Sequence, residues 1–265
     1  MKTPVVVFES PDSIGEHLAA RLLERFSEAR DAGLRFLLGC PTGRTPRPVY
    51  ESIARRLSET GQDMSHVVLV MMDEYLRRSG ATFEYASADA PWSCHNFVRR
   101  EIVNRWNQDL PTERRVREDS VWFPNPADPA AYDKRIADAG GIDFFLLASG
   151  ASDGHVAFNP PGSPRESRTR IIELPESTRR DNLQTFPAFE TLDAVPAYGI
   201  SVGIATIAAA KEAVMLLWGR SKAESLRRIE ATDRYDSNWP ATVIYACARG
   251  EILADRDAAE AIEKR

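Results

Sequence analysis

The sequence predicts an α/β fold: a doubly wound, mostly parallel, Rossmann-like sheet with helices on both faces and a lid segment. Short runs rich in Val, Ile, Leu and Phe alternate with amphipathic stretches along the whole chain, which is the order of a β–α fold. These runs show no strict apolar–polar alternation, as is typical of parallel strands buried on both faces. We therefore expect a single domain over residues 1–265, with the lid at about 160–190.

The expected elements follow one another as strand and helix. Strands are predicted at 4–8, 35–38, 67–72, 143–148, 198–202, 214–217 and 243–246. Helices are predicted at 12–31, 46–59, 95–107, 127–139, 205–211, 221–230 and 256–264. Ser10 before Pro11 and Asp128 before Pro129 are typical helix starts. Segments 77–91 and 160–196 are expected to be rich in loops, and the second is long enough for a lid.

Composition excludes several classes of protein. The chain has 265 residues, 43% of them hydrophobic, which is enough apolar surface to exclude disorder for the bulk. Its 34 basic and 39 acidic residues give a net charge of −5, which argues against nucleic acid or a membrane surface as the partner. No apolar run approaches the roughly 20 residues of a membrane span. Three scattered cysteines predict no disulfide framework and a cytoplasmic location.

Three predicted strand ends carry unusual chemistry, and ligands of such sheets bind at that edge. The first is the segment 39–46, GCPTGRTP. Gly43 permits a close backbone approach, Thr42 and Thr45 supply hydroxyls, and Arg44 adds a charge suited to phosphate. Pro46 pre-sets a helix start, whose free N–H groups favour an anion. A strand-to-helix turn without a ligand is the equally weighted alternative.

The second strand end carries Asp73 and Glu74 directly after a buried run. Two adjacent carboxylates repel each other, and one of them can keep a raised pKa that is useful for proton transfer. A helix cap with a solvated glutamate is the simpler alternative. By itself the pair favours that simpler alternative.

The third strand end carries Asp153 and His155 among glycines, and the aspartate is close enough to orient the histidine. Residues 150–154 also fit the G-x-S-x-G pattern of serine hydrolases. That pattern requires a histidine well downstream of Ser152, and none of the four histidines follows residue 155. A serine hydrolase is therefore excluded. No histidine, cysteine or carboxylate cluster has metal-ligand spacing, so no metal site is predicted.

These motifs together resemble the superfamily of glucosamine-6-phosphate deaminases/isomerases and 6-phosphogluconolactonases, over nearly the whole chain from Val5 to Asp255. The motifs are GCPTGRTP at 39–46, MDEY at 72–75, SCHNF at 93–97, DGHVAFN at 153–159, SRTR at 167–170 and GRSKA at 219–223. The deaminase branch fits better, because lactonases tend to have Asp-Glu-Arg at the second motif and Ser-Asn at the third.

The resemblance implies a role for each matched residue. Asp73 is the base that moves a proton between C2 and C1 of the opened amino sugar. His155 opens the pyranose ring, with Asp153 holding it. Lys222 and the loop Thr42, Gly43, Arg44 and Thr45 bind the 6-phosphate; Glu74, Arg168 and Arg170 are further site candidates. The substrate is a small sugar phosphate, no cofactor or metal is needed, and homo-oligomers occur among relatives.

The chain also departs from the deaminase pattern at the site. Pro160 stands where the pattern has a glutamate that supports the histidine. Gln184 stands at a phosphate-contacting arginine of the lid, for which Arg179 or Arg180 is the alternative. Arg44 replaces a loop glycine. Ser149 and Ala151 replace glycines before Asp153, and an allosteric lysine–threonine pair reads Ile172-Glu173. These changes indicate a divergent member.

Three hypotheses follow. The leading one is a deaminase/isomerase that converts glucosamine 6-phosphate or a relative to a ketohexose 6-phosphate and ammonia. The second is a 6-phosphogluconolactonase-type hydrolase, in which His155 activates water and Asp73 is dispensable. The third is a non-catalytic phosphosugar-binding sensor, against which the retention of both Asp73 and His155 argues.

Overall fold

The computed structural model describes residues 3–263 and contains a seven-stranded sheet in which all neighbouring strands pair in parallel. In spatial order the strands are β1 (Val5–Phe8), β11 (Gly250–Asp255), β10 (Ala213–Leu217), β7 (Phe144–Ala148), β2 (Phe36–Cys40), β3 (Val67–Met71) and β6 (Val121–Trp122). The predicted open parallel sheet is thereby confirmed.

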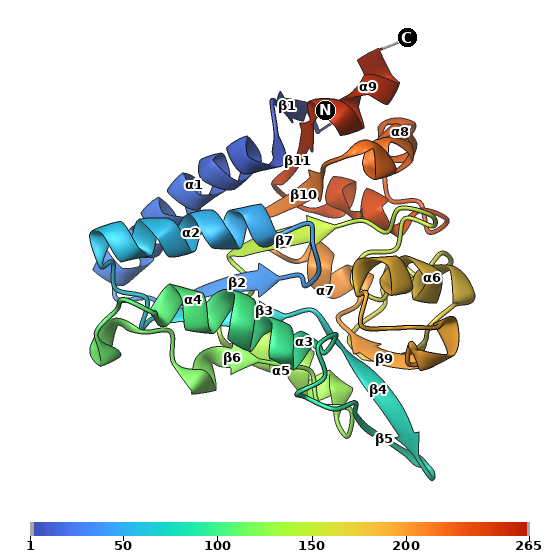
Figure 1. The fold of residues 1–265 in the computed structure, drawn as a ribbon, viewed down its shortest axis with the longest axis horizontal. Coiled ribbons are helices and arrows are strands. Elements are labelled where there is room, and N and C mark those ends of the chain that lie inside the picture. The colour runs from blue at the N-terminus through green and yellow to red at the C-terminus, as the bar shows by residue number, and fades with distance from the viewer. Residues whose placement is uncertain (1–2, 264–265) are drawn as a thin grey trace.

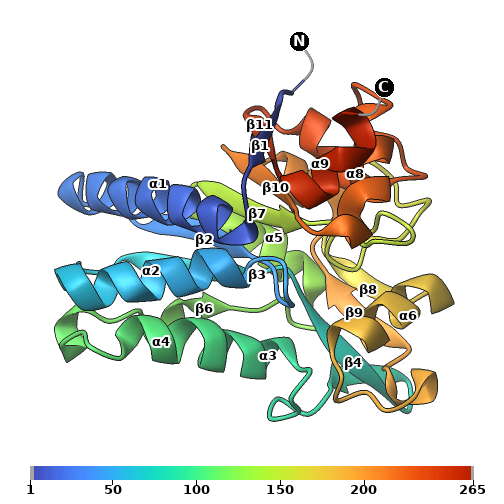
Figure 2. The same cartoon turned by 45° about the horizontal axis from the view of Figure 1, so that its top comes forward.

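Helices cover both faces of this sheet (Figures 1 and 2). One face carries α1 (Pro11–Asp31), α2 (Arg47–Thr60) and a continuous helical stretch made of α3 (Cys94–Phe97), a π-helical segment (Val98–Val103) and α4 (Asn104–Asn107). The other face carries α5 (Pro129–Asp138), α7 (Ile204–Ala208), α8 (Ala223–Glu230) and α9 (Arg256–Glu263). Residue 264 of the last predicted helix lies outside the described residues.

The strand side chains explain why the apolar runs lack alternation. In β2, Phe36 and Leu38 pack into the core under α1 and α2, whereas Leu37 packs into the core on the opposite face. In β7, Phe144 and Phe145 divide in the same way, and both are fully buried. Because each strand is covered on both faces, successive residues are all apolar.

A second, four-stranded sheet was not predicted. Its strands are all antiparallel and lie in the order β5 (Thr82–Tyr85), β4 (Asp73–Ser79), β9 (Tyr198–Ser201) and β8 (Arg170–Glu173). The prediction that 198–202 belongs to the parallel sheet is therefore wrong. The loop-rich segment expected at 77–91 is wrong over 77–85, where β4 and β5 form a hairpin (Figure 1), whereas residues 86–91 lie outside the helices and strands. The exposed Arg77, Arg78 and Glu84 made this hairpin resemble a loop.

The strand predicted at 243–246 is also wrong. Residues Pro240–Ala246 form a 3-10 helix that begins at the proline and buries Val243 and Ile244 in the core. A short apolar run cannot be assigned to strand or helix by periodicity alone. Two parallel strands were not predicted: β11, which pairs with both β1 and β10, and the short β6, which pairs with β3.

The strand order positions the site. The strands β10, β7, β2 and β3 are adjacent and parallel, so their carboxyl ends lie at one edge of the sheet and their following loops lie side by side. The segment after β7 continues through β8 to α6 (Glu176–Thr185). In the described part of the chain, no helix is long and apolar enough to cross a bilayer.

Close packing at β2 gives a stability prediction. A Cβ atom at Gly39 would lie 2.0 Å from the Phe145 ring, so Gly39→Ala forces the strands apart. We expect a loss of about 1–3 kcal/mol in the free energy of unfolding, measured with urea. Phe145→Leu in the same chain should recover part of that loss. If Gly39→Ala were as stable as the wild type, the close packing of Gly39 against Phe145 would be contradicted.

Candidate active site

A cavity of about 180 Å³ lies at the carboxyl edge of the parallel sheet, between the strand-end loops and α6. All three sequence motifs at strand ends contribute to it, together with the turn after β10. Of the predicted site residues, those that line it are Thr42, Gly43, Arg44, Thr45, Asp73, His155 and Lys222. The topology therefore gathers side chains that are as many as 180 positions apart along the chain.

Asp73 is almost fully buried, with 6% of its surface exposed, at the first residue of β4. Burial raises the pKa of its carboxyl to about 7, and the neighbouring Glu74 adds to the rise. A hydrogen bond from the Cys94 thiol, with 3.4 Å between Sγ and Oδ1, and the charge of His155 act in the opposite direction. A carboxyl group with such a pKa can accept and return a proton near neutral pH.

Glu74 is fully buried and does not line the cavity. Its Oε1 accepts the backbone N–H groups of Tyr75 and Cys94, at 2.7 and 3.2 Å. Its Oε2 accepts the Ser93 hydroxyl at 3.0 Å and the His95 N–H at 2.9 Å, and contacts His95 Nδ1. Glu74 thus ties the start of α3 to the start of β4, and a solvated glutamate, the simpler alternative, does not occur.

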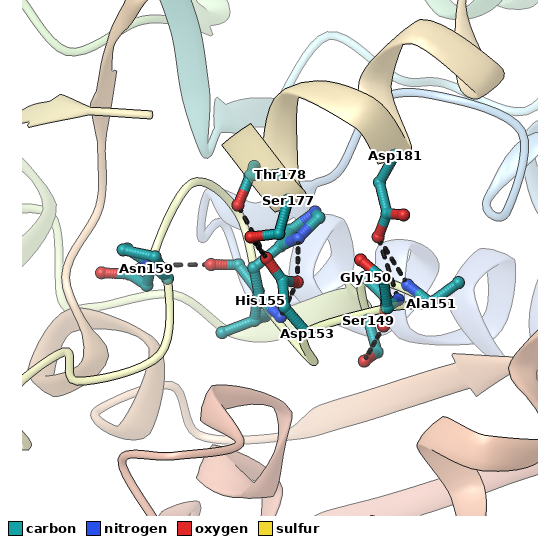
Figure 3. A network of polar contacts seen from close by, with 12 residues as sticks. Ser149, Gly150, Ala151, Asp153, His155, Asn159, Ser177, Thr178 and Asp181 are labelled. Carbon is teal, nitrogen blue, oxygen red and sulfur yellow. Dashed lines mark hydrogen bonds and ion pairs between the residues drawn. The ribbon is translucent and has the colours of Figure 1, made fainter. Parts of the chain in front are cut away.

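His155 and Asp153 form a hydrogen-bonded dyad beside the cavity (Figure 3). His155 Nδ1 lies 2.7 Å from Asp153 Oδ1, while Ser177 and Thr178 of α6 donate to Oδ2 at 2.8 and 2.9 Å. Although burial opposes it, these bonds and the histidine hold the pKa of Asp153 well below its usual range. With Nδ1 occupied, Nε2 is the ring nitrogen left to act on a ligand. A Cβ at Gly150 would lie 2.2 Å from the imidazole, so the ring requires glycine there.

Lys222 and Arg44 make part of the cavity cationic. The Lys222 ammonium donates to the carbonyl oxygen of Ser149. Burial lowers its pKa to about 8, Arg44 contributes to the lowering, and Asp181 and Asp153 oppose it. Gly43 has φ +86°, a conformation that favours glycine, in the loop that leads into α2. Two cations, two threonine hydroxyls and a helix N-terminus suit an anionic group.

The α6 residue Asp181 lines the same cavity, and its Oδ2 accepts the N–H groups of Ala151 and Ser152 at 3.0 and 3.1 Å (Figure 3). Ligand atoms of Asp153, His155 and Asp181 all lie within 4.8 Å of one another, the spacing of a metal site. Hydrogen bonds occupy both oxygens of Asp153, Nδ1 of His155 and Oδ2 of Asp181, so these three side chains are held in place by the contacts described.

Arg168 and Arg170 do not line the cavity. Arg168 is exposed. Arg170 is partly buried and donates to Asn159 Oδ1 at 2.8 Å and to Ser163 Oγ at 3.2 Å. Arg170 therefore braces the segment that follows the dyad.

Sequence reasoning missed four residues of the site: Cys94, Ser177, Thr178 and Asp181. The last three share a signal, because positions 177, 178 and 181 lie on one face of a helix, but only the fold shows which loop that face meets. The Cys94 contact crosses 21 positions and has no local signal.

The fold and the cavity define a Rossmann-like α/β protein with paired acid–base groups and a cationic end at the carboxyl edge of its sheet. The chain belongs to the family of glucosamine-6-phosphate isomerases/6-phosphogluconolactonases, whose sequence model matches residues 9–254.

Its curated relatives include glucosamine-6-phosphate deaminases. That of Shouchella clausii is 32% identical over 261 residues, covering 96% of each chain. That of Beutenbergia cavernae is 35% identical over 227 residues, covering 86% of this chain and 82% of the relative.

Solved structures agree with the fold. A monomeric glucosamine-6-phosphate deaminase has a TM-score of 0.81 and 26% identity, over 98% of this chain and all of that one. The 6-phosphogluconolactonase of Leishmania guyanensis has a TM-score of 0.69 and 17% identity, over 99% of both chains, which is a likeness of fold.

The environment of Asp73 predicts a pH-dependent stability difference. The pKa of Asp73 is raised from 3.8 to about 7 in the folded chain. Between about pH 4 and about pH 7, Asp73 is therefore protonated in the folded chain and ionised in the unfolded chain. Its contribution to stability is therefore fully present below about pH 4 and falls as the pH rises to 7. Asp73→Asn, neutral throughout, should gain about 2–4 kcal/mol over wild type at pH 8 and almost nothing at pH 4. Urea unfolding at both pH values measures this, and a pH-independent difference would contradict it.

Proposed function

We propose that this protein converts a 2-amino-2-deoxyhexose 6-phosphate, such as glucosamine 6-phosphate, to a ketohexose 6-phosphate and ammonia. The observation that supports this proposal most directly is that Asp73, with a pKa near 7, and His155, oriented by Asp153, line one cavity together with Lys222. Relatives named glucosamine-6-phosphate deaminase at 30–35% identity support the same reaction.

The proposed chemistry begins with ring opening. His155, oriented by Asp153, passes a proton between the anomeric hydroxyl and the ring oxygen, which exposes the C1 aldehyde. Asp73 then takes the proton from C2 and returns it to C1, while one proton of the C2 ammonium group passes to the C1 oxygen, which becomes a hydroxyl. An iminium is left at C2. Water adds to that carbon, and ammonia leaves as the C2 ketone forms. The protein supplies two acid–base groups, and the carbonyl and amine belong to the substrate.

The proposed phosphate position is the cationic part of the cavity. Lys222, Arg44 and the hydroxyls of Thr42 and Thr45 would hold the 6-phosphate. Lys222, whose pKa is lowered to about 8, would gain protonation from a neighbouring dianion. Arg44, where relatives of the resembled pattern have glycine, would add a second positive charge.

We also propose that α6 acts as a lid. Its residues Asn182 and Thr185 line the cavity. Ser177, Thr178 and Asp181 form hydrogen bonds with residues 151–153, which precede His155 in the loop after β7. Opening of α6 would therefore loosen the dyad as well as uncover the substrate. The proposed location is the cytoplasm, consistent with three free cysteines.

Two other functions have less support. Lactone hydrolysis rests on fold likeness at 16–19% identity, and it gives Asp73 no task. A non-catalytic sensor would have no use for a buried base beside an oriented histidine. Rapid hydrolysis of 6-phosphogluconolactone that survives Asp73→Asn would favour the first, and sugar-phosphate binding without turnover would favour the second.

Incubation with glucosamine 6-phosphate should release ammonia, measured with a coupled glutamate dehydrogenase assay. Asp73→Asn should lower kcat by about 100-fold to 10,000-fold while KM changes little, because the base acts in the transition state. The acid limb of kcat/KM should have its midpoint near pH 7, since Asp73 must be ionised. If no hexosamine phosphate releases ammonia, the proposal fails.

The phosphate position predicts a different kinetic effect. Lys222→Met should raise KM for the phosphorylated substrate by about 10-fold to 100-fold, because an ion pair with phosphate is lost. Arg168→Met is the matched control, since Arg168 is exposed and outside the cavity. Equal KM values for wild type and Lys222→Met would show that Lys222 does not bind the phosphate.

A further inference from the structure

We propose that Cys94 is a positioning residue for the base, whose thiol orients the Asp73 carboxylate and links it to the proposed phosphate loop. This inference rests on the proposed function, because it assigns a role within the same reaction. Its evidence is a chain of three side chains, Thr42, Cys94 and Asp73, that come from three separate segments.

The thiol lies between the base and the loop. Cys94 Sγ is 3.4 Å from Asp73 Oδ1 and 3.6 Å from Thr42 Oγ1, and its residue is only 1% exposed. The thiol has one hydrogen, and an ionised carboxylate is the stronger acceptor of the two oxygens. The S–H therefore donates to Asp73, and the Thr42 hydroxyl lies against the same sulfur.

The backbone around Cys94 holds the thiol in this direction. Cys94 is the first residue of α3, and its N–H donates to the buried Glu74 at 3.2 Å. The Ser93 hydroxyl donates to the same carboxylate and accepts the N–H groups of His95 and Asn96. Because Glu74 directly follows Asp73, a single strand end places both the base and the helix that carries its thiol partner.

The surroundings favour a hydrogen-bond donor over a nucleophile. Burial, Glu74 and Asp73 all raise the pKa of the Cys94 thiol well above its usual range, so the sulfur keeps its proton. A thiolate would also lie against two carboxylates. Oxidation requires an accessible thiolate, and Cys94 offers neither property.

A weak hydrogen-bond donor suits a residue that orients the Asp73 carboxylate. Without a donor, the ionised form of the buried Asp73 would lose one of its stabilising contacts, and the base would ionise only at higher pH. A strong donor would lower the pKa of Asp73 further and make it a weaker base. A thiol is the weaker donor when compared with the hydroxyl of serine.

The test compares Cys94→Ala and Cys94→Ser with wild type, with Cys247→Ser as the matched control. Cys247 is free, partly buried and outside the cavity. In Cys94→Ala the acid limb of kcat/KM should move up by about half to one pH unit, which lowers kcat/KM about 3-fold to 10-fold below pH 7. In Cys94→Ser the acid limb should move to lower pH, and in Cys247→Ser its position should not change. Unchanged acid limbs in both Cys94 variants would overturn the proposal.

An infrared readout separates this inference from the proposed reaction. The S–H stretching band of Cys94, isolated by subtracting the Cys94→Ala spectrum, should shift to lower frequency as the pH rises through 7 and Asp73 ionises. Asp73→Asn should abolish that shift. If the frequency of the band changes neither with pH nor in Asp73→Asn, the proposed contact between the thiol and Asp73 is wrong. If the band shifts but no ammonia is released, only the proposed function is refuted.

Discussion

The site depends on the fully buried carboxylate of Glu74. Burying a carboxylate is costly unless hydrogen bonds compensate, and here donors from Tyr75, Ser93, Cys94 and His95 surround both oxygens. These contacts join the start of β4, which follows the parallel strand β3 after a single residue, to the start of α3. The adjacent Asp73 is thereby held at the place where the two sheets meet, facing the cavity. Its main donor is one thiol, so the two neighbouring acids have very different environments.

The second constraint is the parallel sheet itself. Four adjacent strands deliver the cationic loop, Asp73, the dyad and Lys222 to the same edge, and residues of α6 complete the lining of the cavity. The dyad is held from both directions, since Gly150 leaves room for the imidazole and Ser177 and Thr178 fix the second oxygen of Asp153. The net charge of −5 describes the molecular surface, while Arg44 and Lys222 make one part of the cavity positive.

Much of the fold could be predicted from the sequence, because apolar strands buried on both faces have a clear signature, as in β2, β3 and β7. The antiparallel sheet could not, since Arg77, Arg78 and Glu84 lie on an exposed hairpin whose strands have no apolar run. The strand prediction at 243–246 was wrong because an apolar run of that length is compatible with both a helix and a strand. At the site, residues in local motifs such as Thr42, Asp73 and His155 could be predicted. Cys94 and Asp181 could not, because tertiary contacts alone bring them there.

In the proposed reaction, the buried Asp73 carboxylate carries a proton between two carbons of the substrate. The most direct measurement is NMR of the ketose formed from glucosamine 6-phosphate in D₂O and, separately, from its C2-deuterated form in H₂O. We expect deuterium at C1 of the product in D₂O. In H₂O we expect partial transfer of the C2 deuterium to C1, because a buried carboxyl group exchanges its proton slowly with solvent. Ammonia released without any deuterium at C1 in either experiment would contradict this role of Asp73.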